Sequence, residues 1–592
     1  MRAVCTAIAL RDCSSRTNAA TVCSAKCLVT AIERSGIAPA GQVRHFDHRS
    51  RSTLFDNRDR REPNGRISIF NIKAIARLDF IGVPFDAQET VPQRVAANNL
   101  RTHTRFHGAR CKMKRWRVEV RVLLAVVLLL IVLSGSRANA YTLLTHEQLI
   151  DLNWQYSIVP LLLSRYPNLT PAQLQEARAY AYGGSVIQDM GYYPFGDKSF
   201  SDLTHYVRSG DFVVSLFRNA HNANELAFAV GALSHYVGDV IGHSEATNLS
   251  VPVEFPKLRA KYGREVSYAE GEHQHVQTEF AFDINEIAHH RMAPVRFLCH
   301  VGLKVPVRQL ALAYYQTYGL SDEFSLRRQR FNVREYRFMV HTFFPRVAYA
   351  ITLLHRGHEP PEQDTADAAA IDREVDRVAA QNDWQRYGRH AGIGTYVLAG
   401  FLFILPKFGP LKLIDVKGPT PATEAAYLHS VVVSTTIMHR ILARFTPPTI
   451  AQTPTAGADD PVSKSQFPQT IPAFMNANPY TLEKSPDPLH PLPNRDLDTG
   501  RVVQPGGYRL TDSTYANLLH RLTRQPSQPI PPGIKQDIQA YYADPNAPIT
   551  TKQNPAQWAQ VEADLATLAA MPTSTEPEPY PTYGDEASAS AE

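Results

Sequence analysis

The spacing of apolar residues changes along the chain and divides it into parts with different predicted structure. Between residues 141 and 360, apolar residues recur every three to four positions, as in helices that bury one face. The alternation that marks half-buried strands is scarce there. We therefore predict an all-α fold, with a multi-helix domain at residues 141–360 and an additional helical segment packed on it at 361–446.

Several of these helices have recognisable starts. In TPAQLQEARAYAYGG, Thr170 is suited to cap a helix and Pro171 to occupy its first turn. Two long helices are predicted to begin at about Asn224 and at about Ser267. Another is predicted in TADAAAIDREVDRVAAQNDWQRYG, which begins at Thr365.

The C-terminal part, residues 447–592, has a different composition. Residues 447–493 contain 11 prolines in 47 positions, too many for a sustained helix, so we predict a linker or an irregular wrapping segment. Short helices are predicted around DSTYANLLHRLTRQ and PPGIKQDIQAYYAD. The acidic tail from Pro572 is rich in Pro and Ser and is predicted to be disordered.

One apolar segment within the helical part, TYVLAGFLFIL at residues 395–405, is too short to span a membrane. It has 11 residues, whereas a spanning helix needs about 20. We predict a buried core helix, and the alternative is a contact with a membrane surface.

Residues 113–140 have the pattern of a secretory signal peptide. A basic start precedes an apolar run at 122–133, and the segment ends in Ala138-Asn139-Ala140. We predict cleavage before Tyr141 and export of the mature protein to the periplasm or the medium. The 12-residue apolar run is shorter than the roughly 20 residues of a membrane span, and an uncleaved anchor helix is the alternative.

Residues 1–112 precede this signal and show no sustained periodicity. Because signal peptides act at the N-terminus, we predict that translation starts at Met113 and that residues 1–112 are a mis-called extension. A genuine extension, basic or disordered, is the alternative.

Charge and cysteine are also unevenly distributed. Residues 1–112 hold 19 Lys and Arg against 9 Asp and Glu, which leaves 43 basic and 47 acidic residues for the rest. The exported chain is therefore slightly acidic, which makes nucleic acid a less favoured partner. Of six cysteines only Cys299 lies after residue 112, so the main body has no disulfide framework.

Candidate chemistry appears in the helix predicted from Asn224, in HYVGDVIGH. His235, Asp239 and His243 are spaced four apart and share one face of a helix. Imidazole and carboxylate groups bind zinc, and burying them in an apolar helix without partners would be costly. A zinc site is predicted here, and a hydrogen-bonded core cluster is the alternative.

Together with other His and acidic residues, this motif resembles the zinc-dependent phospholipase C family, whose superfamily also contains the single-strand-specific nucleases. The resemblance covers about residues 141–280. Its elements, in chain order, are Tyr141 as the mature N-terminus, His146 in YTLLTH, Asp189 in GGSVIQDMGYYPFG, His205 in SDLTHY, then His235, Asp239 and His243, and finally His275 and Glu279 in HVQTE.

The resemblance implies an all-α, exported phosphodiesterase that binds up to three zinc ions. Three ligand groups are implied: Asp189, His205, His235 and Asp239 for one ion; the terminal amine and carbonyl of Tyr141, His146 and a shared Asp239 for a second; and His243, His275 and Glu279 for a third.

The sequence departs from the family pattern in two places. The mature N-terminus is Tyr141 where the family usually has Trp, and three residues separate Asp239 from His243 where five are usual. His273 is a rival to His275, but Gln277 lies four positions after it and is a poor zinc ligand. The remaining histidines are interpreted as surface or structural residues: His221 and His355, each four before a Glu, and His289, His290 and His300.

The implied reaction is attack of zinc-activated water on a phosphodiester, with Asp189 as the catalytic candidate that orients or deprotonates the water. We expect a phospholipid or another phosphodiester as substrate. Glu279 favours the phospholipase branch, because the nucleases have Asp at this position. The spacing of Tyr141 and His146 favours the alternative, a single-strand nuclease on the same site. A non-catalytic, zinc-stabilised envelope protein is the second alternative.

Overall fold

The protein is described by a computed structural model. It describes residues 143–574 with gaps at 195, 321–325, 356–364, 389–391, 405–417, 445, 447–490, 545 and 549–552. Residues 1–112, the predicted signal peptide at 113–140, Tyr141 and the tail beyond 574 lie outside the described residues.

Regular structure in the described ranges is helical, and the prediction of an all-α fold is confirmed. Extended pairing there is limited to two isolated bridges, Arg495 with Val502 and Ile530 with Thr573. The helices of the first half are α2 (Leu143–Asn153), α3 (Val159–Arg165), α4 (Pro171–Ser185), α5 (Lys198–Tyr206), α6 (Ser209–Arg218), α7 (Ala223–Gly242), α8 (Asn248–Glu254), α9 (Pro256–Tyr262), α10 (Tyr268–Ala288), α11 (Val295–Val301) and α12 (Val307–Tyr318).

The later helices are α13 (Leu326–Phe338), α14 (Phe344–His355), α15 (Ala366–Gln381), α16 (Ile393–Ile404), α17 (Pro421–Ala443), α20 (Arg509–Thr523), α21 (Pro532–Tyr541) and α23 (Pro555–Ala570). Short 3₁₀ and π turns join some of them: η1 (Trp154–Ile158), η2 (Ile187–Gly191), η3 (His243–Thr247), η5 (Met339–Phe343) and η6 (Trp384–Tyr387).

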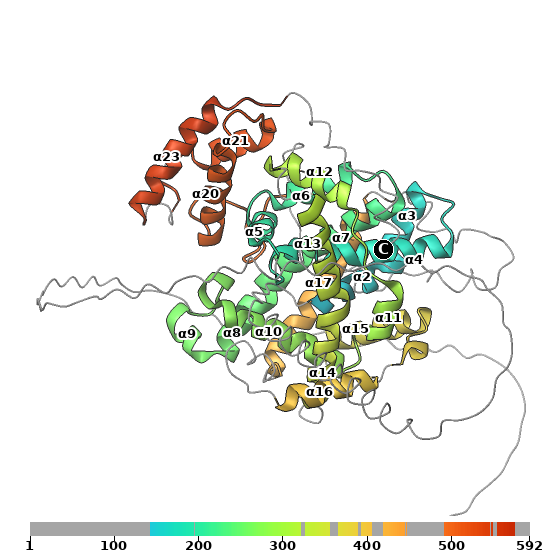
Figure 1. Cartoon of the computed structure of the whole chain (residues 1–592). Coiled ribbons are helices and arrows are strands. Elements are labelled where there is room, and N and C mark those ends of the chain that lie inside the picture. The colour runs from blue at the N-terminus through green and yellow to red at the C-terminus, as the bar shows by residue number, and fades with distance from the viewer. Residues whose placement is uncertain are drawn as a thin grey trace, which may run out of the picture. The chain divides into compact units, whose positions relative to one another are not determined.

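The central element is α7, which is buried along its whole length from Ala227 to Gly242. It packs against α2, α4, α6 and α17 (Figure 1). Helices that are apolar around most of their circumference are buried on most sides, which explains this position. The Asn222 side chain caps its start by accepting a hydrogen bond from the Glu225 N–H at 3.0 Å.

Two glycines let α4 and α7 lie side by side with their backbones in contact (Figure 1). A Cβ on Gly184 would lie 2.1 Å from the Phe228 carbonyl oxygen, and one on Gly231 would lie 2.2 Å from that of Ala181. Because only glycine fits such a close approach, this crossing fixes η2, the turn that follows α4, beside the middle of α7.

The helix starts expected from the sequence are confirmed. Thr170 caps α4 in a capping box: its hydroxyl accepts from the Gln173 N–H at 3.3 Å, and the Gln173 side chain accepts from the Thr170 N–H at 2.9 Å. Ser267 and Glu270 form the same motif at α10, and the Thr365 side chain caps α15.

The apolar helix α16 differs from its prediction. Its buried residues, Ala399 and Leu402, pack against α14, but Val397, Phe403 and Ile404 are 68%, 69% and 73% exposed. The expectation of a buried core helix is therefore wrong for one face, because α14 covers only one side of it. In the described part of the chain, no helix combines the length and apolarity needed to cross a membrane.

Two of the C-terminal helices, α20 and α21, lie where short helices were predicted, whereas α23 was not predicted. Helix α20 packs on α23 and on α5. Residues 494–507, which precede α20, form a loop that is held to the start of α6 by hydrogen bonds between Arg495 and Ser209. The C-terminal part of the chain thus contacts the helices that surround α7.

Candidate metal centre

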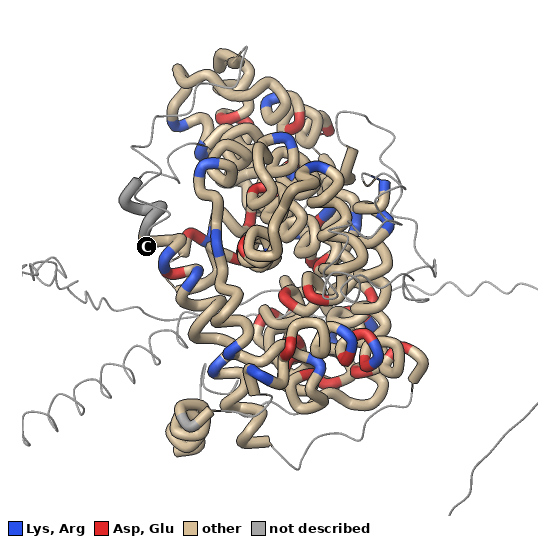
Figure 2. Tube along the Cα trace, turned by 90° about the vertical axis from the view of Figure 1, so that its right-hand side faces the viewer, with Lys and Arg blue, Asp and Glu red and all other residues tan. Residues whose placement is uncertain are grey.

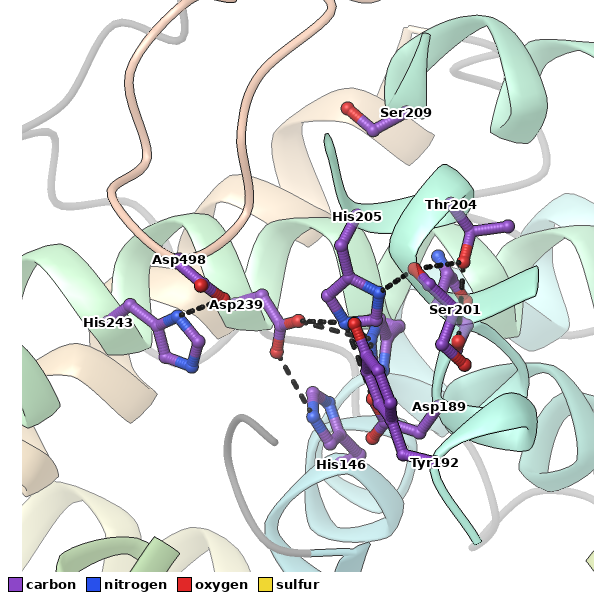
Figure 3. Close-up of polar contacts among 12 residues, drawn as sticks. His146, Asp189, Tyr192, Ser201, Thr204, His205, Ser209, Asp239, His243 and Asp498 are labelled. Atoms are coloured by element: carbon purple, nitrogen blue, oxygen red, sulfur yellow. Dashed lines mark hydrogen bonds and ion pairs between the residues drawn. The ribbon is translucent and has the colours of Figure 1, made fainter. Parts of the chain in front are cut away.

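Eight of the nine predicted metal ligands come together, while Tyr141 lies outside the described residues. All eight are buried and fall into three overlapping or adjacent groups with the spacing of metal ligands. Figure 3 shows five of them, His146, Asp189, His205, Asp239 and His243. These groups are His146, Asp189 and His235; His205, His235 and Asp239; and His243, His275 and Glu279.

The first cluster is built around the carboxylate of Asp239, in the last turn of α7. Its Oδ1 lies 3.2 Å from His146 Nε2, and its Oδ2 lies 3.1 Å from His235 Nε2 and 3.4 Å from His205 Nε2. Three imidazoles from α2, α5 and α7 thus face one carboxylate through the same ring atom. Figure 3 shows two of them, His146 and His205, beside Asp239. A carboxylate with two oxygens directed at different imidazoles can bridge two cations.

Asp189 joins the same cluster from η2, the turn that the crossing of α4 and α7 fixes. Its Oδ1 lies 3.3 Å from His205 Nε2 and 3.9 Å from His235 Nε2. The predicted grouping put His146 with Tyr141 and Asp239, whereas here His146 also shares a group with Asp189 and His235. The first two predicted groups are therefore one continuous cluster.

The second cluster contains His243, His275 and Glu279. Glu279 Oε1 lies 2.7 Å from His275 Nδ1 and 3.5 Å from His243 Nε2. His243 begins the π turn η3 at the end of α7, a type of helix irregularity often found at functional sites. With the unusual three-residue spacing after Asp239, His243 still reaches His275, and the rival His273 is exposed.

The imidazoles of the first cluster are oriented by backbone carbonyls. His205 Nδ1 lies 2.8 Å from the Ser201 carbonyl oxygen, and His235 Nδ1 lies 3.0 Å from that of Ser185. A nitrogen that donates to a carbonyl leaves the other ring nitrogen, Nε2, as the acceptor. Metal-binding histidines are usually held in this way.

His146 is positioned by the capping of α2. Asp283 of α10 accepts hydrogen bonds from the Leu144 N–H at 3.1 Å, the Thr145 N–H at 3.2 Å and the Thr145 hydroxyl at 2.7 Å. These bonds satisfy backbone donors that the first turn of a helix leaves without partners. The His146 ring then stacks on that of His235, with 4.3 Å between ring centroids.

Burial and close contacts shift the pKa values of the cluster in opposite directions. Burial lowers the pKa of His275 to about 4 and raises that of Glu279 to about 8. Burial would also lower the pKa of His205, but contacts with Asp189 and Asp239 prevail and raise it to about 10. Burial works against ionisation of Asp239, yet the surrounding histidines hold the pKa of this carboxyl well below its usual range.

The donor set fits zinc. The oxygens of Asp239 and the ring nitrogens of His243 face ionisable partners at 3.1–3.7 Å but make no hydrogen bond of regular geometry within the described residues. Leaving a buried polar group without such a bond costs about 1–3 kcal/mol. A hydrogen-bonded core cluster would pair these atoms. Zinc binds both His nitrogen and carboxylate oxygen at about 2.0–2.2 Å, so a divalent cation would satisfy atoms that the protein leaves without hydrogen bonds.

Two residues at the second cluster were not predicted from the sequence. Asp498, from the loop at 494–507, lies with its Oδ1 3.7 Å from His243 Nδ1 (Figure 3). Asn248 Oδ1 lies 2.9 Å from His275 Nε2. No helical spacing connects Asp498 to the motif residues, so the sequence alone contained no signal that could identify it.

The other singled-out histidines lie apart from these clusters. His221 is exposed, and its backbone N–H donates to Glu225 Oε2 at 2.7 Å. His289 contacts the Asn285 carbonyl oxygen, and His300 contacts the side chain of Gln175. The partner expected for His355, Glu359, lies outside the described residues.

The region that contains both clusters is similar to a known protein family. Residues 145–322 match the family model described as zinc dependent phospholipase C. The matched region contains all eight described ligand candidates but ends well before Asp498. No curated protein and no solved structure matches the chain.

Proposed function

Because residues 145–322 belong to the zinc-dependent phospholipase C family, we propose that the protein is an exported, zinc-dependent phosphodiesterase of the phospholipase C type. The observation that carries this proposal is the buried convergence of His146, Asp189, His205 and His235 on Asp239. Bound zinc would supply an activated water and stabilise the developing charge on a phosphoryl group.

The residues that would hold zinc are those of the two clusters. His146, Asp189, His205, His235 and Asp239 form the first, and His243, His275 and Glu279 form the second. Signal-peptide cleavage before Tyr141 would add an α-amino group. With a pKa of about 7.7–8.0, against about 10.4 for lysine, such an amine loses its proton readily. Export and completion of the metal centre would then be coupled.

Asp189 is the candidate for handling the proton of the attacking water. Its side chain keeps 6% exposure, whereas the side chains of Asp239, His146, His205 and His235 have none. Asp189 is thus the carboxylate among these five residues that retains some exposure, and such a carboxylate can orient a water molecule and accept its proton. The other ligands would hold the ions without contacting solvent.

The choice of a lipid substrate is supported by the exposed face of α16. Val397, Phe403 and Ile404 form an apolar surface that water contacts in the described structure. Exposed apolar surface of this kind suits contact with a membrane. A phospholipid presented at a membrane surface would then be a suitable source of the phosphodiester.

A nuclease is the second candidate, and one helix supports it. The sequence of α13 contains five arginines with interleaved aromatic residues, and α13 packs against η2, which carries Asp189. Phe331 and Phe338 on this helix are exposed. Such a combination favours single-stranded nucleic acid. Elsewhere along the described trace, basic residues are mixed with acidic ones (Figure 2), which does not favour it.

The test is an assay of the protein beginning at Tyr141 on phosphatidylcholine vesicles, single-stranded DNA and an aryl phosphodiester, with and without chelator. We expect chelator-sensitive hydrolysis of the lipid. Activity on DNA alone would select the nuclease, and full zinc content without any activity would select the non-catalytic alternative. Active protein without zinc would contradict the proposed mechanism.

The role of Asp189 is tested in the same assay with Asp189→Asn. We expect a loss of about 100-fold or more in rate, since general base catalysis contributes about 10²–10⁴-fold. The matched control is Asp202→Asn, because Asp202 lies nearby on α5 and bonds Lys198 and Tyr192 rather than the histidines. Equal losses in the two variants would contradict the assignment.

A further inference from the structure

Three histidines of the metal centre are oriented by a neighbouring acceptor. In each, one ring nitrogen faces a carboxylate and the other faces this acceptor. For His205 and His235 the acceptor is a backbone carbonyl, and for His275 it is Asn248 Oδ1. His243 is the fourth. Its Nε2 faces Glu279 at 3.5 Å, and its Nδ1 faces the Oδ1 of Asp498 at 3.7 Å. Asp498 thus has the place that an orienting acceptor has at the other rings.

Asp498 is held firmly in this place. Its Oδ2 accepts hydrogen bonds from the hydroxyls of Tyr206 at 2.8 Å and Tyr508 at 2.7 Å. Its backbone carbonyl accepts from Asn248 Nδ2 at 2.7 Å. The side chain is fully buried, and its Oδ1 makes no hydrogen bond to any described residue. One oxygen is therefore anchored while the other is directed at His243.

Asn248 links this loop to the second cluster directly. The same side-chain amide donates to the Asp498 carbonyl through Nδ2 and contacts His275 Nε2 through Oδ1. The positions of Asp498 and His275 are therefore coupled through one residue on α8.

The backbone of the loop is fitted against α7 and α5. Gly500 has a φ of +69°, and a Cβ on it would lie 2.6 Å from the Val240 carbonyl oxygen. The Leu497 N–H donates to the His205 carbonyl at 3.1 Å. Since only glycine combines a positive φ with so close an approach, the loop is shaped for contact with the helix that carries His243.

From these contacts we propose that Asp498 is a positioning residue of the metal centre, supplied by a loop outside the family-matched region. Its Oδ1, 3.7 Å from His243 Nδ1, orients that ring electrostatically and so directs Nε2 toward the cation shared with His275 and Glu279. Carboxylates behind metal-binding histidines commonly have this role. The inference rests on the proposed zinc centre but not on the identity of the substrate.

The test uses the full mature chain with Asp498→Asn, which keeps the size of the side chain and removes its charge. We expect the ion at the second cluster to bind about 10–100-fold more weakly in a chelator titration, the range typical of such outer partners. We also expect a changed absorption spectrum after replacement of zinc by cobalt. Circular dichroism shows whether the variant is folded.

The matched control is Asp496→Asn in the same loop. Asp496 is also buried, but it accepts hydrogen bonds from Thr499 rather than facing a histidine. We expect lowered thermal stability with an unchanged cobalt spectrum. A second variant, Gly500→Ala, alters no carboxylate chemically but shifts the loop that carries Asp498 away from α7. It should weaken binding of the ion at the second cluster. This variant keeps the proposal testable if Asp498→Asn does not fold.

The results distinguish failure of the proposed zinc-dependent function from failure of the role assigned to Asp498. If the unaltered chain binds no zinc, both the proposed function and this inference fail. If it binds zinc, and folded Asp498→Asn or Gly500→Ala retains the same chelator titration and cobalt spectrum, only the inference fails.

Discussion

The two clusters of the centre are assembled in different ways. The cluster around Asp239 draws its ligands from α2, η2, α5 and α7, all within the matched region, and backbone carbonyls orient two of its rings. The cluster of His243, His275 and Glu279 also draws its ligands from that region, but Asp498 approaches it from the C-terminal loop. The described ligands of the first cluster thus all lie within the matched region, whereas the second cluster also has a carboxylate from a distant segment beside it.

Under the proposed role of Asp498, a matched region does not contain every residue that acts on its site. Every residue has a backbone carbonyl, so an orienting partner of that kind does not require a particular side chain. A side-chain partner such as Asp498 requires one residue at one position. The second cluster is therefore the part of the centre that changes in the C-terminal segment can alter selectively.

The largest effect is expected from Asp239→Asn. This carboxylate faces three imidazoles at 3.1–3.4 Å, so its loss should abolish metal binding at the first cluster. Residues that only contact metal ligands contribute up to about 100-fold to activity, and loss of a ligand itself should lower activity by more than that. Zinc content and hydrolysis rate check this. A zinc content equal to that of the unaltered chain would show that the first cluster is not a metal site.

A smaller and more selective effect is expected from Glu279→Gln. Glu279 contacts His275 and His243 and does not face the first cluster. The variant should lose the ion held at the second cluster and keep the metal at Asp239, with a loss in activity below that of Asp239→Asn. Elemental analysis after dialysis measures this. Loss of all metal would mean that the two clusters are not separable.

The crossing of α4 and α7 is tested by Gly231→Ala. The new Cβ would lie 2.2 Å from the Ala181 carbonyl oxygen, and overpacking of this kind costs about 1–3 kcal/mol of unfolding free energy. Because the crossing fixes η2, activity should fall as well through displacement of Asp189. Chemical denaturation and the lipid assay measure the two effects, and an unaltered stability would contradict the packing argument.

The smallest effect is expected from Thr170→Ala at the exposed start of α4. It removes one half of the capping box and should cost about 1 kcal/mol of unfolding free energy. Thr170 is distant in sequence from every ligand, so zinc content and activity should not change. A marked loss of zinc here would indicate that general destabilisation, rather than ligand loss, lowers metal binding in the other variants.

Much of the helical structure was predictable because its signals are local. Thr170, Ser267 and Thr365 lie at helix starts as expected, since a side-chain cap involves residues three positions apart. The four-residue spacing of His235 and Asp239 likewise fixes a shared face. For α16 the local pattern was insufficient, because its apolar residues do not reveal that only one face is covered.

The sequence by itself determined the all-α fold, the helix starts and the order of the ligand candidates, because these depend on residues that are near one another along the chain. Only the tertiary structure decided that His146 joins Asp189, that His243 rather than a neighbour faces His275, and that Asp498 lies behind His243. These contacts join segments through helix crossings and a loop. They depend on close backbone approaches, such as those at Gly231 and Gly500, that no local spacing encodes.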